Sequence, residues 1–403
     1  MTRRQRNVGS TAQTRLKNRE GFALFMALGA LVVIAILVAG SSFITLQESQ
    51  LGQNQLVQSR AMAAAEYGLN KIQSDWDKTP NLQMSNGTHF DMNYTLTNQG
   101  TCRVRINRLN NETFWLVSEG RATVGNSASQ ARTAVKRVSA FLRLRIPTIK
   151  ANAAITAGGN VSVKGGADID GHNTNPPGWS GCSSGVDKPG VVVPTGYSAT
   201  TQGSSSITGS ACTAPGVPAN CGWSTDPLAA DSNSYIRYGD ENWNTLTAQA
   251  NVQLNGGTIG NSVQPSVLNG SCNKADQLNW GEPSRDAGYV TECTNYFPII
   301  YSNGDLTLNG NGRGQGILLI KGSVTINGHF EWDGLIVVTN DIVRGNGSAQ
   351  IHGGVMARNE VKADESVISG TTNYYYSACA LERAMRGSAQ VVQGKERAWV
   401  ELY

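Results

Sequence analysis

The chain has 403 residues and a mass of 42.9 kDa, which is too large for one compact core and predicts two or more domains. Only 15% of the residues are charged and 7% are aromatic, whereas 46 are glycine. This composition argues against disorder, a coiled coil or a Rossmann-type enzyme and favours many short strands and tight turns. Residues 1–21 hold 6 of the 33 basic and 1 of the 29 acidic residues, so the remainder has a net charge of −1 (27 basic, 28 acidic). A basic body that binds nucleic acid is therefore not expected.

An apolar segment follows the basic N-terminus. Residues 22–39 carry no polar side chain, and no charge occurs between Glu20 and Glu48. At about 1.5 Å per residue, a helix over residues 22–46 crosses a hydrocarbon core of about 30 Å. The basic flank predicts that the leader stays in the cytoplasm and that the C-terminal part lies outside it. A cleaved secretory signal, whose apolar region is usually about 7–15 residues, and a generic signal anchor are the alternatives.

The helical pattern continues beyond the membrane segment. Apolar residues recur at intervals of mostly three to five from Phe43 to Trp76, with polar residues between them, and no proline precedes Pro80. We therefore expect one long helix over residues 22–76, apolar all round in its first half and amphipathic in its second.

At these residues the chain resembles type IV pilins and pseudopilins, and more narrowly the PilX-type minor pilins. The resemblance covers about residues 15–145. It depends on the basic leader that ends in Gly21-Phe22 and on an A-A-E-x-G-L element at Ala64-Ala65-Glu66-Tyr67-Gly68-Leu69. It implies that a prepilin peptidase cuts after Gly21, that the new N-terminus at Phe22 is methylated, and that the helix packs against other pilin subunits in a fibre.

The fifth position after the expected cleavage site departs from the pattern of most major pilins. Those pilins carry a glutamate there that pairs with the N-terminal amine of a neighbouring subunit, whereas this chain has Met26. A buried carboxylate is costly unless it is paired, so its absence changes how the subunit docks. The resemblance therefore implies a minor or tip-located subunit rather than the bulk subunit.

Residues 80–147 are expected to form a small antiparallel sheet that packs on the helix, because four strand-like segments alternate with Gly/Asn turns. In the last segment, the apolar residues from Val138 to Ile146 occupy every second position. The positions between them form the other face of the strand, which carries Arg137, Arg143 and Arg145. That face either meets water, which we favour, or binds DNA or an anionic glycan.

Residues 148–403 are predicted to form an all-β domain, a parallel β-solenoid with a β-sandwich as the alternative. Aliphatic runs that start at Gly316, Gly334 and Gly354 recur at spacings of 18 and 20 residues (334 − 316 and 354 − 334). Within each repeat a second aliphatic slot follows, at Val324, Ile342 and Val361. The C-terminus is expected to form a helix and then a strand that caps the open end of the solenoid.

An irregular, cysteine-containing insertion is expected at about residues 172–300 between early and late repeats. Loops on a rigid scaffold commonly bind ligands, so surface or glycan binding would be expected here. Four tryptophans either present exposed rings or fill a loop-rich core: Trp179, Trp223, Trp243 and Trp280. Disulfides are expected within the insertion, with Cys272–Cys293 the preferred pair, and the odd count of 7 cysteines leaves one thiol free or intermolecular.

Metal and catalytic chemistry have little support. No CxxC pair, nucleophile elbow, P-loop or His-Glu-x-x-His motif occurs, so no cofactor or catalytic residue is predicted. The four histidines are scattered (His89, His172, His329 and His352), and only Asp168 and Asp170 with Asn173 resemble a weak cation site. A polysaccharide-processing enzyme needs clustered carboxylates, whereas those of the repeats are few and are predicted to be mostly spread over different slots: Glu331, Asp333, Asp341, Glu360, Asp364 and Glu365.

The sequence thus predicts a minor structural subunit of a type IV pilus or related fibre that acts in assembly or surface adhesion and is not an enzyme. Its expected partners are other pilin subunits, the prepilin peptidase and, before assembly, the inner membrane, with a surface or glycan as a further partner. The alternative is a signal-anchored surface β-helix protein that binds or processes polysaccharide. Cleavage after Gly21 distinguishes the two.

Overall fold

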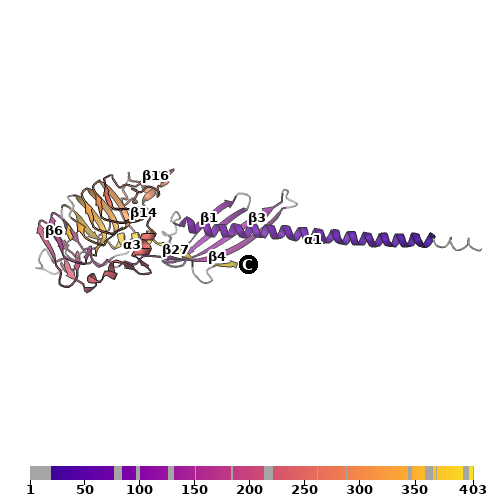
Figure 1. The fold of residues 1–403 in the computed structure, drawn as a ribbon, viewed down its shortest axis with the longest axis horizontal. Coiled ribbons are helices and arrows are strands. Elements are labelled where there is room, and N and C mark those ends of the chain that lie inside the picture. Colours follow the sequence, from indigo (N-terminus) through magenta and orange to yellow (C-terminus); the bar gives the residue numbers. More distant parts are fainter. Residues whose placement is uncertain are drawn as a thin grey trace, which may run out of the picture.

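The structure is a computed structural model that describes residues 20–76, 84–96, 100–125, 131–149, 151–182, 185–212, 221–260, 262–286, 288–343, 347–358, 366–368, 370–393 and 399–402. A long helix, α1 (Glu20–Ser74), projects from an antiparallel sheet, and a β-rich head lies at the other end of that sheet (Figure 1). This is the expected order of a long N-terminal helix followed by largely β structure. The helix begins and ends two residues earlier than the predicted range 22–76.

The antiparallel sheet covers the second half of α1. It contains β1 (His89–Leu96), β2 (Gly100–Arg108), β3 (Thr113–Val124) and β4 (Arg132–Arg145), each paired with the next. The predicted alternation in β4 is present, because Val138, Ala140, Leu142 and Leu144 are buried. They form a core with helix residues such as Leu69 and Ile72.

The A-A-E-x-G-L element has a packing role in this chain. Ala64 and Ala65 are fully buried, and Gly68 lies so close to the sheet that an added Cβ would be 2.5 Å from Oγ of Ser118 and 2.7 Å from Cγ2 of Val104. On the facing strand β3, an added Cβ at Gly120 would collide with the backbone of Ala65. Small residues on both sides therefore allow the helix and sheet backbones to approach closely.

The C-terminal strands correct the expected domain boundary. After the helix α3 (Ala378–Gly387), β27 (Gln390–Gln393) and β28 (Trp399–Leu402) both pair antiparallel with β4, next to residues 142–145 and 137–140. The predicted C-terminal cap on the head is therefore wrong for these strands. They cover the edge of β4 whose backbone groups would otherwise be unpaired. Residues 148–403 consequently do not form a separate unit.

The head is built from parallel strands in three sheets. The largest sheet contains β5 (Ile155–Ala157), β7 (Asp168–Asp170), β8 (Val191–Val193), β10 (Ser206–Thr208), β11 (Trp223–Thr225), β14 (Val252–Leu254), β18 (Ile299–Ser302), β20 (Gly312–Ile320), β22 (His329–Val338), β24 (Ser348–Ala357) and β26 (Asn373–Tyr376). A second sheet contains β15 (Gly257–Ile259), β19 (Leu306–Leu308), β21 (Val324–Ile326) and β23 (Ile342–Val343), and a third contains β6 (Val161–Gly165), β9 (Ala199–Gly203) and β25 (Ser366–Ile368).

Smaller elements complete the head. Two hairpins are formed by β12 (Arg237–Tyr238) with β13 (Glu241–Asn242) and by β16 (Val267–Leu268) with β17 (Ser271–Cys272). A short helix, α2 (Trp243–Ala248), and the 3-10 turns η3 (Ser210–Cys212), η4 (Pro227–Ala230), η5 (Ser232–Tyr235) and η6 (Thr291–Cys293) lie in the connections.

The repeat register differs by one residue from the predicted one. Gly316 pairs with Gly334, and Gly334 pairs with Gly353 rather than Gly354, which gives offsets of 18 and 19 residues (334 − 316 and 353 − 334). Gly334 has a φ of +144°, and a Cβ there would collide with the carbonyl oxygen of Gly316. These glycines therefore form a column where the backbone admits no side chain. In the second slot Val324 pairs with Ile342 as predicted, and Val361 lies outside the described residues.

The order of strands in space overturns the expectation of an irregular insertion. In the sheet, β5 lies between β24 and β8, so the first repeat of the head contacts one of the last. From β5 the chain advances to β8 and β11, returns to the opposite end at β14, and then advances through β18, β20 and β22 to β24. Residues 172–300 therefore supply strands to the same stack, and both connections to the antiparallel sheet leave from the middle of that stack.

Candidate functional site

The first half of α1 is an exposed apolar surface. No residue in its most apolar stretch of 18 residues is buried, and α1 is long and apolar enough to cross a membrane. Phe22, at the predicted cleavage site, is 68% exposed, and Met26 is 64% exposed. Gly21 lies in the first turn of the helix, before Phe22. Because the antiparallel sheet covers only the second half of α1, the first half has no partner within the described chain.

Three disulfides are present, and they are not confined to the predicted insertion. Cys272 is joined to Cys293, the preferred pair, and Cys212 is joined to Cys221. Cys182 is joined to Cys379 over a separation of 197 residues, which ties a loop of the head to α3. Cys102 is the free thiol among the cysteines; it is buried on β2, where burial raises its pKa.

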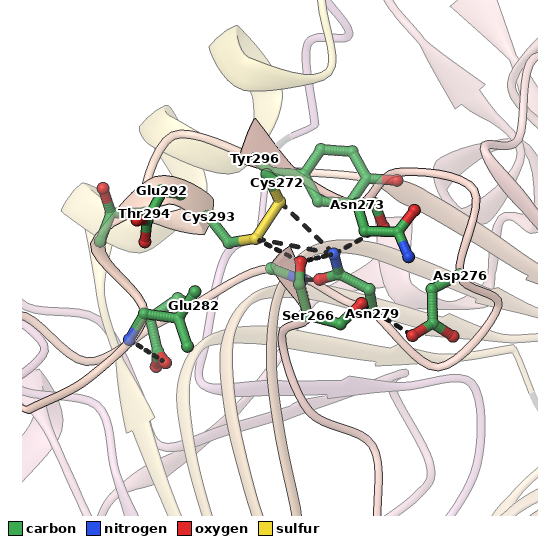
Figure 2. The surroundings of a disulfide bond; sticks show 12 residues. Ser266, Cys272, Asn273, Asp276, Asn279, Glu282, Glu292, Cys293, Thr294 and Tyr296 are labelled. Carbon is green, nitrogen blue, oxygen red and sulfur yellow. Dashed lines mark hydrogen bonds between the residues drawn. A yellow bond between two sulfur atoms is a disulfide. The ribbon is translucent and has the colours of Figure 1, made fainter. Parts of the chain in front are cut away.

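The side-chain amide of Asn279 lies beside the Cys272–Cys293 bond and donates hydrogen bonds around it, as Figure 2 shows. Nδ2 of Asn279 donates to the carbonyl oxygens of Asn273 at 2.8 Å and Ser266 at 3.2 Å, and it lies 3.4 Å and 3.6 Å from the two sulfur atoms. The bond therefore fixes the base of the β16–β17 hairpin to the turn η6. These contacts join an amide, two backbone carbonyls and the disulfide sulfurs, and we assign the bond a structural role.

The four tryptophans do not form an exposed aromatic surface. Trp280 is fully buried against Phe330 and Trp332, and Trp179 is 6% exposed. Trp223 and Trp243 are partly buried against the same core. The interpretation of these residues as exposed ligand contacts is therefore wrong, and the alternative, that they fill the core, is right.

Two polar rows run across the outer side of the parallel stack, where alternate side chains of each strand point away from the core. Residues paired from strand to strand form the first row: Arg313, Glu331, Gln350, Asn373, Asp168 and Ser206. Residues two positions further on form the second row: Gln315, Asp333, His352, Tyr375, Asp170 and Thr208. The residues between the rows are buried and apolar: Trp332, Ile351, Tyr374, Ile169 and Ile207.

A buried acid–base pair lies in the second row. Nδ1 of His352 is 3.0 Å from Oδ1 of Asp333, and the side chains are 9% and 7% exposed. The ring of His352 stacks on Tyr375 with 5.1 Å between centroids. Burial raises the pKa of Asp333, against the opposing effect of His352. Glu331, two residues before Asp333 on the same face, is hydrogen-bonded to His329 at 3.4 Å.

The expectation that the carboxylates of the repeats are mostly spread over different slots has an exception at Glu331 and Asp333. Glu331, Asp333 and His352 line one cavity of about 160 Å³, together with Gln350 and loop residues that include Pro283 and Tyr289. The signal in the sequence was the i, i+2 spacing of Glu331 and Asp333, which places both on one face of a strand. Asp341 is buried on another segment, and Glu360, Asp364 and Glu365 lie outside the described residues.

The residues that resembled a weak cation site form hydrogen bonds with other groups of the chain. Oδ1 of Asp170 accepts hydrogen bonds from Thr208 and interacts with Nδ1 of His172 at 2.6 Å, whereas Oδ1 of Asn173 accepts from the backbone N–H of Ala378. Among the described residues, no group of three or more His, Cys, Asp or Glu side chains could hold a metal ion. His89 lies exposed on β1, away from these groups.

The basic face of the antiparallel sheet is largely paired. Arg103 and Arg105 bind Asp91 at 2.6 Å and 2.9 Å, and their hydrogen bonds hold the pKa of that carboxyl well below its usual range. Arg137 binds Glu119 at 2.7 Å, and Arg143 lies 3.3 Å from Asp240. These pairings favour the interpretation of this face as a solvated strand surface.

A cavity of about 450 Å³ lies where the sheet meets the head, and its lining includes three arginines, Arg108, Arg383 and Arg386. Each cation already has partners in the chain. Arg108 donates to backbone carbonyls, Arg383 lies 4.8 Å from the ring centre of Trp179, and Arg386 binds Glu382 at 3.0 Å. The cavity therefore joins the two parts and presents no unpaired cation to a ligand.

Comparison with known proteins gives a distant likeness to a solved structure. No protein-family model and no curated protein sequence matches the chain. A solved structure that resembles it is the crystal structure of the competence-associated pilin ComZ from Thermus thermophilus. That match has 14% sequence identity and a TM-score of 0.25, and it covers 86% of this chain and 97% of that chain. At this TM-score the likeness does not establish the fold, which follows from the strand pairings described above.

Proposed function

We propose that this chain is a minor structural subunit of a type IV pilus or a related fibre. The observation that carries the proposal is the exposed first half of α1, which contrasts with the packed second half of the same helix. An apolar helix surface of this length is stable only when lipid or other helices cover it. A lipid bilayer covers it before assembly, and the helices of other pilin subunits cover it in the fibre.

We further propose that a prepilin peptidase removes residues 1–21 and that the amine of Phe22 is then methylated. The proposal is supported by the sequence Gly21-Phe22 at the boundary between the basic leader and the apolar helix. The chain would be oriented with the leader in the cytoplasm, in agreement with the distribution of basic residues.

The head would be displayed at the outer end of the subunit, as a β-solenoid in which each turn of chain stacks on the next. The in-register parallel pairs Gly316–Gly334 and Gly334–Gly353 support this interpretation. Met26 in place of glutamate supports a position at or near the tip, because the subunit lacks the carboxylate that would pair with a neighbouring N-terminal amine. A role in assembly or adhesion would follow from that position.

N-terminal mass spectrometry of the full chain, purified from membranes and from sheared surface fibres, tests the proposal. We expect a methylated N-terminus at Phe22 in the fibre fraction. Gly21→Val should block processing, whereas Gly29→Val, at an exposed helix position with no atom within 4 Å of an added Cβ, should not. An N-terminus at Met1 or Thr2, found only in membranes, would contradict the proposal and favour the signal-anchored surface protein.

A further inference from the structure

The two polar rows form a track on one face of the stack. Some of its members also support the loop above it: Nε2 of Gln315 donates to loop carbonyls, and Nε of Arg313 donates to Glu282. Neighbouring strands lie about 4.8 Å apart, so six strands carry each row over roughly 24 Å. The inner strands β7, β22, β24 and β26 each have a neighbour on both sides in the sheet, so their backbone N–H and C=O groups are paired and only side chains are available to a ligand on this face. A ligand that uses the track must therefore offer hydrogen-bonding groups at short intervals along an extended chain.

The cavity of about 160 Å³ lies over the first part of the track. Glu331, Asp333, Gln350 and His352 belong to the sheet, and Tyr289 and Pro283 belong to a loop that overhangs it. Ligand sites commonly combine such apolar walls with a few convergent polar groups. The ring of Tyr289 is held by Arg313, whose guanidinium carbon lies 4.9 Å from the ring centre.

The pair Asp333–His352 is the strongest sign that the cavity binds something. Removing a carboxylate and an imidazole from water is costly. The paired positions on neighbouring strands hold uncharged residues, Gln315 and Tyr375, so the stacking of the strands does not itself require an acid–base pair here. The hydrogen bond between the pair uses Nδ1 and Oδ1. Oδ2 of Asp333 and Nε2 of His352 are then available to a ligand that enters the cavity.

We propose that the cavity and the two polar rows bind an uncharged oligosaccharide that lies across the strands. Sugar hydroxyls both donate and accept hydrogen bonds, which suits a surface of carboxylate, amide and imidazole groups. The C–H faces of a pyranose suit the ring of Tyr289 and the adjacent proline. The inference supplies the ligand for the adhesive part of the proposed function, but it does not require that the chain enter a fibre.

Charge and backbone geometry exclude the other polymers. The rows carry four carboxylates, Glu331, Asp333, Asp168 and Asp170, which repel nucleic acids and polyuronates. An extended peptide commonly binds through backbone hydrogen bonds at the edge of a sheet, whereas this track lies on its face.

Isothermal titration of the full chain in detergent micelles tests the inference. The probes are cellotetraose and tetra-N-acetylchitotetraose, with tetragalacturonate as the anionic control. We expect saturable binding of at least one uncharged tetrasaccharide and weaker or no binding of tetragalacturonate. Asp333→Asn should weaken binding tenfold or more, because the amide oxygen stays with His352 and the acceptor Oδ2 that faces the ligand is replaced by an NH2 group, which can only donate.

Control variants separate a ligand contact from a structural effect. Asn at position 333 keeps an oxygen that accepts from His352, so the thermal midpoint of the variant should not fall. If it does fall, Gln350→Ala, at an exposed position in the cavity, provides the second test and should also weaken binding. Glu119→Gln, on the antiparallel sheet, should leave binding unchanged.

Three outcomes would overturn the inference: no binding of either uncharged probe, tighter binding of tetragalacturonate, or binding that Asp333→Asn and Gln350→Ala both leave unchanged. The N-terminal residue of the same preparation is read separately. A start at Phe22 without sugar binding would overturn only this inference, whereas sugar binding by an unprocessed chain would overturn only the fibre proposal.

Discussion

An added Cβ atom on Gly68 would lie 2.5 Å from the hydroxyl oxygen of Ser118, so that α1 contacts β3 at a point that admits no side chain. Gly68→Ala should lower the free energy of unfolding by about 1–3 kcal/mol, because the buried neighbours Val104 and Ser118 must shift. Gly52→Ala, in the same helix with nothing within 4 Å, should instead raise it by about 0.5–1 kcal/mol. Thermal unfolding followed by circular dichroism measures both, and equal effects would contradict the close approach.

A buried ion pair supports the loop over the cavity. Nε of Arg313 lies 2.9 Å from Oε1 of Glu282, whose side chain is fully buried. Arg313→Met should destabilise the head by about 3–5 kcal/mol, because it leaves a buried carboxylate without its cation. The double variant Glu282→Gln/Arg313→Met should recover most of this loss. Arg137→Met, in an exposed pair with Glu119, should cost about 0–1 kcal/mol. Chemical unfolding followed by tryptophan fluorescence measures the free energies of unfolding. If the loss in the double variant equals the sum of the losses in the two single variants, the prediction is contradicted.

The disulfide between Cys182 and Cys379 should stabilise the head more than the one between Cys212 and Cys221. The separations are 197 and 9 residues, and the loss of entropy in the unfolded chain grows with the length of the closed loop. Replacing the long-range pair by serine should cost roughly 5 kcal/mol, and replacing the short-range pair roughly 3 kcal/mol. Unfolding midpoints of the two double variants under oxidising conditions test the order, which the reverse ranking would refute.

Acid should weaken the antiparallel sheet through Asp91. Hydrogen bonds from Arg105 and Arg103 lower the pKa of this carboxyl in the folded state, so the folded protein binds its proton less readily than the unfolded chain. The stabilisation is therefore present above the unfolded pKa of about 3.9 and is lost as the pH falls below it. Asp91→Asn should flatten the dependence of the unfolding midpoint on pH below about 4. Asp240→Asn, in a pair with the exposed Arg143, is the control and should change it little.

Glutamate at position 26 should move the subunit from the tip toward the shaft. In the proposed fibre, Met26 lacks the carboxylate that would pair with a neighbouring N-terminal amine. Met26→Glu should increase the amount of this chain in sheared fibres, measured by quantitative immunoblotting against the major subunit. Leu31→Glu, at a position that is 65% exposed on the same helix, should instead reduce it, because the added carboxylate has no expected partner. Equal effects of the two variants would contradict a specific role for position 26.

Local pattern predicted the elements that depend on neighbouring residues. The apolar run and the three- to five-residue spacing predicted α1 to within two residues at each end, and the alternation from Val138 to Leu144 predicted the buried face of β4. In the repeats, the spacing of Gly316 and Gly334 agreed with the register, whereas the next glycine differed by one residue. Gly353 and Gly354 are adjacent, and only strand pairing distinguishes them.

Contacts between distant segments were decided by the tertiary structure. The sequence by itself determined a long helix with an apolar first half, a strand-rich remainder and a repeat of 18 to 20 residues, because each of these follows from the pattern of side chains along the chain. It did not determine that β27 and β28 return to β4, that β5 stacks on β24, or that Glu331, Asp333 and His352 share a cavity. Those relationships join residues far apart in the chain. They arise because an unpaired strand edge forms hydrogen bonds, and an apolar face is buried, against any complementary surface, whatever its position in the sequence.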